Sequence, residues 1–323
     1  MKLPLITIGL TTYNAEDTVE RAVNSALSQS YRPIEIVAVD DCSTDQTLEI
    51  LRLLSIKHPE IRIFSNQANG GVSKSRNHIL QNAKGEFIVF FDDDDESHPD
   101  RLEKQYLRIK EYENRYANGA PVICHTAREL HYPDGTIRLE STMGESEGGL
   151  APSGLVVAKR ILLGSPVKDG YGSCATCSQM ARLATYQSLG GFDLALRRGE
   201  DTDFNIRLAV FGGHFVGISY PLVIQRMTKT PDKSLENEYE NIRVLLAKHR
   251  NIMEMEGMYK FCCDWVEIKY DWLQNKHFAF TVHFIRLALM HPILTFRRLV
   301  MALPNIRVNL AFSRFHLSRN KFK

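Results

Sequence analysis

Four consecutive acids, Asp92 to Asp95, follow the apolar run Phe87–Phe91. Adjacent ionised carboxylates repel one another, and at the buried end of a strand their charge is costly unless a cation neutralises it. A divalent ion would remove that cost. The run of acids therefore predicts a metal site at the end of a strand.

Polar residues follow two other apolar runs in the same way. Thr11-Thr12-Tyr13-Asn14 comes directly after Leu5–Leu10, and the acids Asp40 and Asp41 follow Ile34–Val39. Asp40 stands at a strand end beside a second acid, which has no simple structural explanation. We expect these residues to belong to the same site as the run of acids.

Two more polar clusters are ambiguous by themselves. The segment 69–77 is a glycine-containing loop that leads into a helix with Lys74 and Arg76, and a helix start with nearby cations suits a phosphate. The segment 199–203, Gly-Glu-Asp-Thr-Asp, suits acids that cap a helix. Ser43 or Thr44 with Asp45 is expected to cap another helix that begins near residue 46.

The first hundred residues alternate short apolar runs with helical patterns, which is typical of successive strand–helix units. Such units build a mostly parallel sheet with helices on both faces, and ligands bind beyond the carboxyl ends of the strands. The polar clusters described above all fall at those ends. The expected strands are 5–10, 34–39, 61–64 and 87–91, and the expected helices are 16–29, 44–54, 72–82 and 99–116.

The pattern changes after residue 118. A hairpin is expected from 122–130 and 136–139, a loop over 141–154, helices over 178–189 and 202–211, and strands over 215–219 and 222–225. Beyond about residue 232 every pattern is helical. We therefore predict a catalytic domain over 1–231 and a basic helical subdomain over 232–323.

Together these motifs resemble the family-2 glycosyltransferases, which are inverting enzymes with the nucleotide-sugar-binding fold called GT-A. The resemblance runs from residue 5 to about 226. It rests on the order and spacing of several motifs that are each common alone: Thr-Thr-Tyr-Asn at 11–14, the Asp-Asp stretch at 40–47, Asn-x-Gly with Arg-Asn at 69–77, the acids at 92–95 with Pro99, and Gly-Gly-Phe-Asp at 190–193 followed by 199–203.

The resemblance implies roles for individual residues. Asp201 matches the general base, and Glu200 the acid that orients the acceptor. Asp94 and Asp92 match the metal ligands of the DxD motif, for Mn²⁺ or Mg²⁺. The nucleotide of the donor, expected to be a UDP-sugar, is implied to contact Thr11, Tyr13, Asp40, Arg76 and Asp93.

The acceptor is expected to be a glycan or a lipid-linked saccharide of cell-surface polysaccharide or lipopolysaccharide synthesis. Its predicted contacts are Tyr171, Ser178 and Arg182, beside the loop 144–154. One departure from the family concerns the histidine that many relatives place shortly after an arginine near the end of this domain. Here Arg226 is followed by Met-Thr-Lys, which leaves the third protein ligand of the metal open, with Lys229 or Lys233 as alternative sources of charge.

Composition points to a reduced globular protein with an unusual tail. The six cysteines and the absence of an apolar signal segment predict a cytoplasmic location. Residues 272–323 contain nine Lys or Arg and no Asp or Glu. This tail is expected either to pack on the catalytic domain or to associate peripherally with an anionic membrane at its inner face. No nucleic-acid-binding module is recognised, so nucleic acid is not an expected partner.

Two other functions stay open as alternatives. A sugar nucleotidyltransferase would use a similar sheet, acids and metal, but would need a glycine-rich phosphate loop near the first strand, where this chain has Thr-Thr-Tyr-Asn. A non-catalytic carbohydrate-binding or scaffolding protein would fit the missing histidine, but it would not need both acid motifs.

Overall fold

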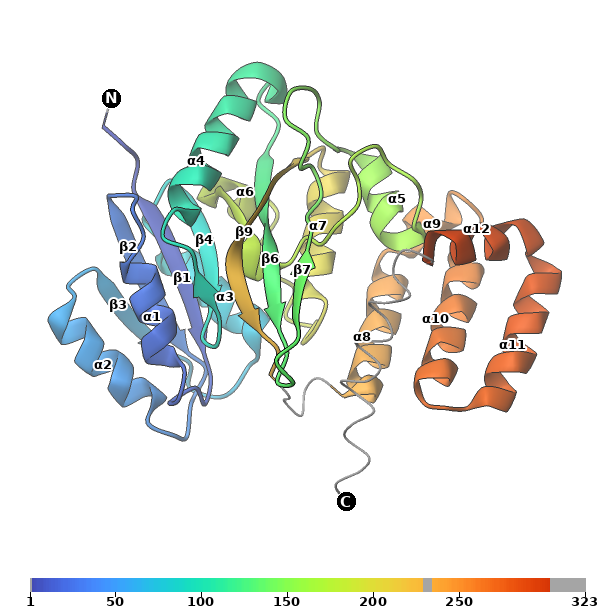
Figure 1. Ribbon diagram of the computed structural model, residues 1–323, viewed down its shortest axis with the longest axis horizontal. Coiled ribbons are helices and arrows are strands. Elements are labelled where there is room, and N and C mark those ends of the chain that lie inside the picture. The colour runs from blue at the N-terminus through green and yellow to red at the C-terminus, as the bar shows by residue number, and fades with distance from the viewer. Residues whose placement is uncertain (1, 229–233, 303–323) are drawn as a thin grey trace. The chain divides into compact units, whose positions relative to one another are not determined.

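The computed structural model describes residues 2–228 and 234–302 of the chain. The described residues form two compact units, one of residues 2–158 with 166–228 and one of residues 159–165 with 234–302 (Figure 1). Lys229, Lys233 and the basic residues beyond 302, to which the sequence assigned roles, lie outside the described residues.

A single mixed sheet with helices on both faces organises the first unit (Figure 1). Its strand order is β3-β2-β1-β4-β8-β6-β9-β5, with β7 paired to β6. The pairs β1–β2, β1–β4, β2–β3 and β6–β9 are parallel and the others antiparallel. The strands are β1 Ile6–Thr12, β2 Ile34–Asp40, β3 Ile61–Ser65, β4 Phe87–Asp92, β5 Glu96–Ser97, β6 Val122–His131, β7 Ile137–Glu140, β8 Met180–Arg182 and β9 His214–Arg226. The predicted fold class, a mostly parallel mixed sheet flanked by helices, is confirmed.

Helices pack on the two faces of this sheet because each has an apolar side. Val19, Ala22, Val23 and Ala26 are the buried residues of α1 and recur at helical spacing. The bounds in this unit are α1 Val19–Leu27, α2 Thr47–Lys57, α3 Val72–Asn82, α4 Arg101–Tyr112, a π-helical turn Glu113–Ala117, α5 Leu155–Leu163, a 3₁₀ turn Thr176–Ser178, α6 Leu183–Ser188 and α7 Glu200–Val210. The last residues of α5 belong to the second unit.

A glycine lets α3 approach the sheet closely. A Cβ atom at Gly9, in the middle of β1, would lie 2.6 Å from the Cγ2 atom of Ile79 on α3. Only glycine fits this approach without a shift of the neighbours. The same helix carries Arg76 near its start, so the close packing at Gly9 fixes how far that side chain reaches past the strand ends.

The register of the parallel strands brings the polar clusters together. Thr12 of β1 pairs with Asp40 of β2, and Thr11 pairs with Asp92 of β4. These pairs are the last in their ladders, at the carboxyl edge of the sheet. The edge predicted from sequence to hold the site is therefore formed as expected.

The sequence prediction missed several short elements after residue 95. The segment 178–189, predicted as one helix, is a 3₁₀ turn, strand β8 and helix α6, because three residues of β8 are too few to show a strand period. The predicted strands 215–219 and 222–225 form one strand, β9, with a register shift against β6 near Ala127. Helix α5 follows the predicted loop and was not foreseen.

A buried histidine in β6 makes the stability of the first unit depend on pH. His125 is fully buried and stacks on Phe215, and burial, with the charge of Arg128 nearby, lowers its pKa to about 3. The unfolded chain binds a proton below a pKa of about 6.5 whereas the folded chain does not, so stability is complete above that pH and falls as the pH decreases toward 3.

We expect the wild type to lose about 2 kcal/mol more than a His125→Phe variant between pH 7.5 and pH 5. Urea unfolding at both pH values measures this difference. His277→Phe, at an exposed histidine, is the control. Equal pH dependence in wild type and His125→Phe would contradict the prediction.

The second unit is helical. Its helices are α8 Leu235–Lys248, α9 Arg250–Glu254, α10 Tyr259–Leu273, α11 His277–Met290 and α12 Pro292–Ala302. Ser234 caps α8, because its hydroxyl accepts a hydrogen bond from the backbone N–H of Asn237. Among the described residues no single helix is long and apolar enough to cross a membrane, although α11 and α12 together reach that length and composition with a bend of 117° between them.

Candidate active site

The carboxyl ends of β1, β2 and β4 form the floor of the candidate site. Asp40 is buried at the end of β2, where its carboxylate accepts hydrogen bonds from the Thr12 hydroxyl at 3.4 Å and from the backbone N–H of Ser43 at 3.0 Å. The backbone N–H of Tyr13 donates to the Asp93 carboxylate at 2.8 Å. Three of the clusters that sequence placed at one site are thus joined by direct hydrogen bonds.

The turn after Asp40 is held by side chains rather than capped as expected. Asp45 accepts a hydrogen bond from the backbone N–H of Thr47, the first residue of α2, at 3.0 Å, but the N-cap residue of α2 is Gln46, whose side chain forms no capping hydrogen bond. Ser43 and Thr44 do not cap this helix. Their groups bind Asn14 instead: the Asn14 N–H donates to the Ser43 hydroxyl, and the Thr44 N–H donates to the Asn14 side chain.

Asp41 has a structural role that the sequence did not reveal. Its buried carboxylate accepts hydrogen bonds from the backbone N–H groups of Gly70 and Gly71, the latter at 2.7 Å, and from the Asn66 amide at 2.7 Å. These bonds fix the loop that begins α3. The second acid after β2 therefore positions the helix that carries Arg76.

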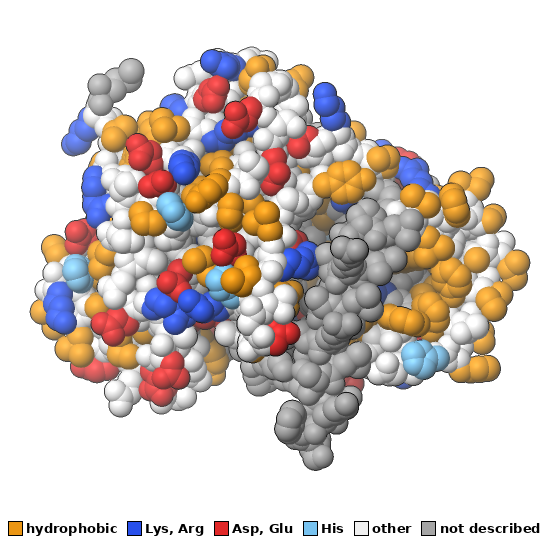
Figure 2. Space-filling view, viewed as in Figure 1, with side chains coloured by type: hydrophobic (Ala, Val, Ile, Leu, Met, Phe, Trp, Pro, Cys, Tyr) orange, Lys and Arg blue, Asp and Glu red, His pale blue; other side chains and the backbone are white. Residues whose placement is uncertain are grey.

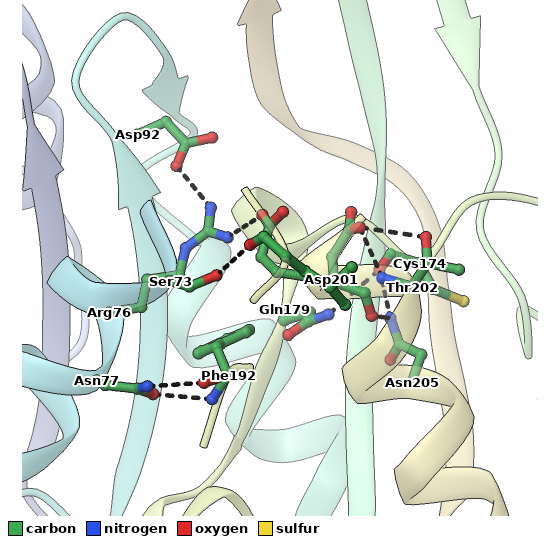
Figure 3. A network of polar contacts seen from close by, with 12 residues as sticks. Ser73, Arg76, Asn77, Asp92, Cys174, Gln179, Phe192, Asp201, Thr202 and Asn205 are labelled. Carbon is green, nitrogen blue, oxygen red and sulfur yellow. Dashed lines mark hydrogen bonds and ion pairs between the residues drawn. The ribbon is translucent and has the colours of Figure 1, made fainter. Parts of the chain in front are cut away.

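Arg76 links the two acid motifs of the chain (Figure 3). Its buried guanidinium forms ion pairs with Glu200 at 2.6 Å and with Asp92 at 3.2 Å, and it lies over the ring of Phe192. Burial by itself would lower the pKa of Arg76, but the nearby charges of Asp92, Glu200 and Asp201 raise it above its ordinary value. The guanidinium is occupied by two carboxylates, so its predicted contact with the donor nucleotide stays a prediction.

The start of α7 is tied to α3 at several points (Figure 3). The Ser73 hydroxyl donates to the carbonyl of Leu196, and the side chain of Asn77 exchanges two hydrogen bonds with the backbone of Phe192, at 2.7 and 2.8 Å. These contacts hold the segment just before α7 against the helix that carries Arg76. They explain why Glu200 meets Arg76 although 124 residues separate the two.

Glu200 and Asp201 stand side by side on α7 in different environments. Gly199 precedes them with a φ of +77°, a conformation that favours glycine. Glu200 is buried, and burial together with the neighbouring charge of Asp201 raises its pKa despite the ion pair with Arg76. Asp201 is half-buried, and its carboxylate accepts a hydrogen bond from the Thr202 N–H at 2.6 Å. Asp203, by contrast, is fully buried and binds Arg207 at 2.8 Å, a structural role.

Two acids of the run Asp92 to Asp95 have raised pKa values. Burial, with the charges of Asp94 and Asp92, raises the pKa of Asp93 to about 7, and burial likewise raises the pKa of Asp95 well above its usual range. One carboxylate oxygen of Asp95 accepts from the Arg226 N–H at 3.0 Å, while the other is buried with no hydrogen-bond partner among the described residues. Such a cluster fits a bound cation, which would neutralise it.

Two sets of ligands in this cluster could hold a metal ion. Asp92, Asp95 and Cys177 place ligand atoms within 4.8 Å of one another. Burial raises the pKa of the Cys177 thiol to about 12, so this side chain is protonated and a poor ligand, and the Arg128 guanidinium contacts its sulfur. The predicted pair, Asp92 and Asp94, has partly exposed side chains. We therefore favour this pair.

Thr228 lies where the sequence left the third metal ligand open. Its hydroxyl donates a hydrogen bond to the Asp94 carboxylate at 2.9 Å. The Arg21 guanidinium holds the same acid from its backbone side, by a bond of 3.1 Å to the carbonyl of Asp94. Both contacts orient Asp94, and of the two residues Arg21 was not predicted to belong to the site.

The three residues predicted to contact the acceptor are dispersed. Tyr171 is exposed on a loop, whereas Ser178 is buried and its hydroxyl donates to the carbonyl of Ala175. Arg182 pairs with Phe87 at the opposite end of β4 from Asp92, and its guanidinium binds Glu113 at 2.6 Å. The structure does not bring Arg182 into the cluster of acids.

Comparison with known proteins shows which family this part of the chain resembles. Residues 7–150 match the family model described as glycosyl transferase family 2. The chain carries a family-2 glycosyltransferase domain. An uncharacterized glycosyltransferase of Haemophilus influenzae is 40% identical over 105 residues, which are 32% of this chain and 42% of that protein.

A second relative has a more specific name. The UDP-Glc:alpha-D-GlcNAc-diphosphoundecaprenol beta-1,3-glucosyltransferase WfaP of Escherichia coli is 42% identical over 93 residues, which are 29% of this chain and 36% of WfaP. The chain thus matches less than half of the length of either relative, and the family model matches its N-terminal part, residues 7–150.

The fold extends further than the sequence similarity. The crystal structure of S. aureus TarS 1-349 in complex with UDP is similar with a TM-score of 0.59, over 82% of this chain and 71% of that one, at 21% identity. The glycosyltransferase domain of this chain therefore has the GT-A fold, as its motifs indicated.

Proposed function

We propose that this protein is an inverting glycosyltransferase that moves a sugar from a nucleotide diphosphate donor, a UDP-sugar, to a hydroxyl group of a glycan or lipid-linked acceptor. The observation that carries the proposal is the contact of the two acid motifs through Arg76, which holds the start of α7 beside the end of β4. A general base and a diphosphate site have to lie this close for one sugar to be displaced between them.

We assign a separate role in the reaction to each group of residues. Asp201 accepts the proton of the acceptor hydroxyl as its oxygen attacks the anomeric carbon from the face opposite the nucleotide. Its neighbour Glu200 is engaged by Arg76, which leaves Asp201 as the half-exposed carboxylate of the pair. Asp40, Thr11 and Tyr13 bind the nucleoside, with Asp93 beneath Tyr13.

Asp92 and Asp94 would hold Mn²⁺ or Mg²⁺, which when bound supplies positive charge to the departing diphosphate. The proposal is supported by the raised pKa of Asp93 and by the unpartnered oxygen of Asp95, which mark a site short of positive charge. The hydrogen bond from Thr228 keeps Asp94 in place for this task.

We expect the metal ion, in the presence of the nucleotide, to stabilise the protein only when the Asp94 carboxylate is present. In the presence of UDP, the melting temperature of the wild type should rise on addition of Mn²⁺ and return on addition of a chelator. At a ligand concentration of one hundred times its Kd, binding should add about 2.7 kcal/mol to the free energy of unfolding. Asp94→Asn should lose this shift. Asp264→Asn, at a partly exposed acid of α10 that pairs with Lys260, is the matched control. A metal-dependent shift that survives in Asp94→Asn would contradict the assignment.

Cell-surface polysaccharide synthesis is the proposed setting, with the enzyme peripheral at the inner face of the cytoplasmic membrane. The similarity to WfaP, whose name gives a diphosphoundecaprenol-linked acceptor, supports a lipid-linked acceptor. The match covers 36% of WfaP, so it supports the class of acceptor and does not identify the sugar. Release of free UDP that requires added acceptor would test transfer against the scaffold alternative.

A further inference from the structure

Large apolar side chains form an exposed stripe along α11 and α12. They recur at helical spacing within α11 and again, beyond the bend, within α12. Members of the stripe are Phe278, Val282, Ile285, Leu289, Ile293, Phe296 and Val300, with exposed fractions from 46% to 84%. Figure 2 shows hydrophobic side chains gathered over the helices of this unit.

Other residues of α11 and α12 form the side of these helices that packs within the unit. Leu287 of α11 and Thr295 of α12 are nearly fully buried, and the Thr295 hydroxyl bonds to the Leu287 carbonyl. His283 pairs with Asp271 of α10 at 2.8 Å. The stripe is therefore not the core face of the helices but a second apolar face, and exposed patches of this kind mark interaction surfaces.

The charges around the stripe select the class of partner. Arg286 and Arg297 are exposed on the same two helices, and the exposed Lys276 directly precedes α11. From Trp272 to the end of the chain, nine Lys or Arg occur without a single Asp or Glu. An apolar face bordered by cations is complementary to the interface of a bilayer with anionic lipids. A stripe meant for a second copy of this chain would bring like charges together.

The lengths of the two helices indicate that they would lie on a bilayer and not span it. Helix α11 has 14 residues and α12 has 11, which give roughly 21 Å and 16 Å and fall short of the ~30 Å of hydrocarbon that a spanning helix crosses. The bend of 117° between them excludes one continuous span. A helix that carries an exposed Arg and packs one side on its own protein lies in the plane of the interface.

We propose that the α11–α12 stripe is a docking surface for an anionic lipid bilayer, on which both helices lie with Phe278, Ile285, Ile293 and Phe296 among the acyl chains. This inference deepens the proposed function, since it names the surface that would bring the enzyme to a lipid-linked acceptor. It does not depend on catalysis, because binding to lipid needs neither donor nor acceptor.

Flotation of the full-length protein with vesicles tests the proposal. Vesicles of phosphatidylcholine with phosphatidylglycerol should carry the wild type to the top of the gradient at low salt, and vesicles of phosphatidylcholine alone should carry much less. Ile285→Glu/Ile293→Glu replaces two stripe residues with exposed fractions of 53% and 80%, and should weaken binding at least about tenfold. The matched control is Leu53→Glu/Ile56→Glu on α2, with exposed fractions of 52% and 80%, which should bind as the wild type does.

Three results would overturn the proposal. The wild type could stay in the bottom fraction with anionic vesicles. The stripe variant could float as well as the wild type, which would assign binding to basic charge alone. The wild type could be a dimer by light scattering that the stripe variant dissociates, without vesicle binding, which would assign the stripe to a second copy. Transfer to a soluble acceptor, measured in parallel, separates these failures from a failure of the proposed function.

Discussion

Asp201→Asn should abolish sugar transfer while donor binding stays unchanged. Asn cannot accept the proton of the acceptor hydroxyl, and a positioned general base contributes about 10²- to 10⁴-fold to the rate. The amide can still accept the hydrogen bond that the Thr202 N–H gives to Asp201, so the start of α7 should keep its geometry. Initial rates of UDP release in the presence of acceptor measure the loss, and calorimetry with UDP and Mn²⁺ measures donor binding.

The comparison needs a variant that removes the same charge elsewhere. Asp264→Asn removes a carboxylate that pairs with Lys260 on the surface of α10, and we expect its turnover to match that of the wild type. An Asp201→Asn enzyme with turnover within about threefold of wild type would rule out this residue as the base. Loss of both transfer and donor binding would indicate a disturbed site instead.

Arg76→Met should lower both stability and activity. The substitution leaves Glu200 and Asp92 without their shared partner in a buried position, and breaking a buried ion pair by removing one member costs about 3–5 kcal/mol. At about 2–4 °C per kcal/mol for a domain of this size, the melting temperature should fall by on the order of 10 °C. Turnover should decrease as well, because Glu200 no longer holds the start of α7 in place.

A second substitution separates this positioning role from a direct contact with the donor. In Arg76→Met/Glu200→Gln the buried carboxylate is neutral, so part of the lost stability should return, and the double-mutant cycle should show a coupling energy. If Arg76 only contacted the nucleotide, Arg76→Met would weaken donor binding and leave the melting temperature unchanged. Thermal unfolding without ligand distinguishes the two roles.

Sequence patterns predicted the part of the site that parallel strands build. Thr12, Asp40 and Asp92 each lie at the end of an apolar run, and parallel strands place such ends at one edge of the sheet. The alternation of strands and helices along the chain was therefore enough to predict that these residues lie together. The fold class followed for the same reason. Recognition of the family motifs added roles for Asp201 and Glu200 that spacing could not supply, and those roles remain predictions.

Contacts between distant segments were beyond sequence reasoning. The ion pair of Arg76 with Glu200 depends on how α3 packs over Gly9 and on the bonds of Asn77 to Phe192, none of which leaves a local pattern. Asp41 looked like part of the binding site, yet its oxygens are used to hold a loop. The strand β8 was too short to show a period.

The segment 159–165 belongs to the helical unit although it lies between elements of the glycosyltransferase domain. Lys159 pairs with Glu256, and the carbonyl of Leu162 meets the sulfur of Cys262. The polypeptide therefore enters this unit, leaves it and returns. A gene fusion or truncation with its junction near residue 230 would separate Lys159 and Leu162 from those partners, so exchange of the C-terminal part between homologous enzymes has to include this inner heptapeptide.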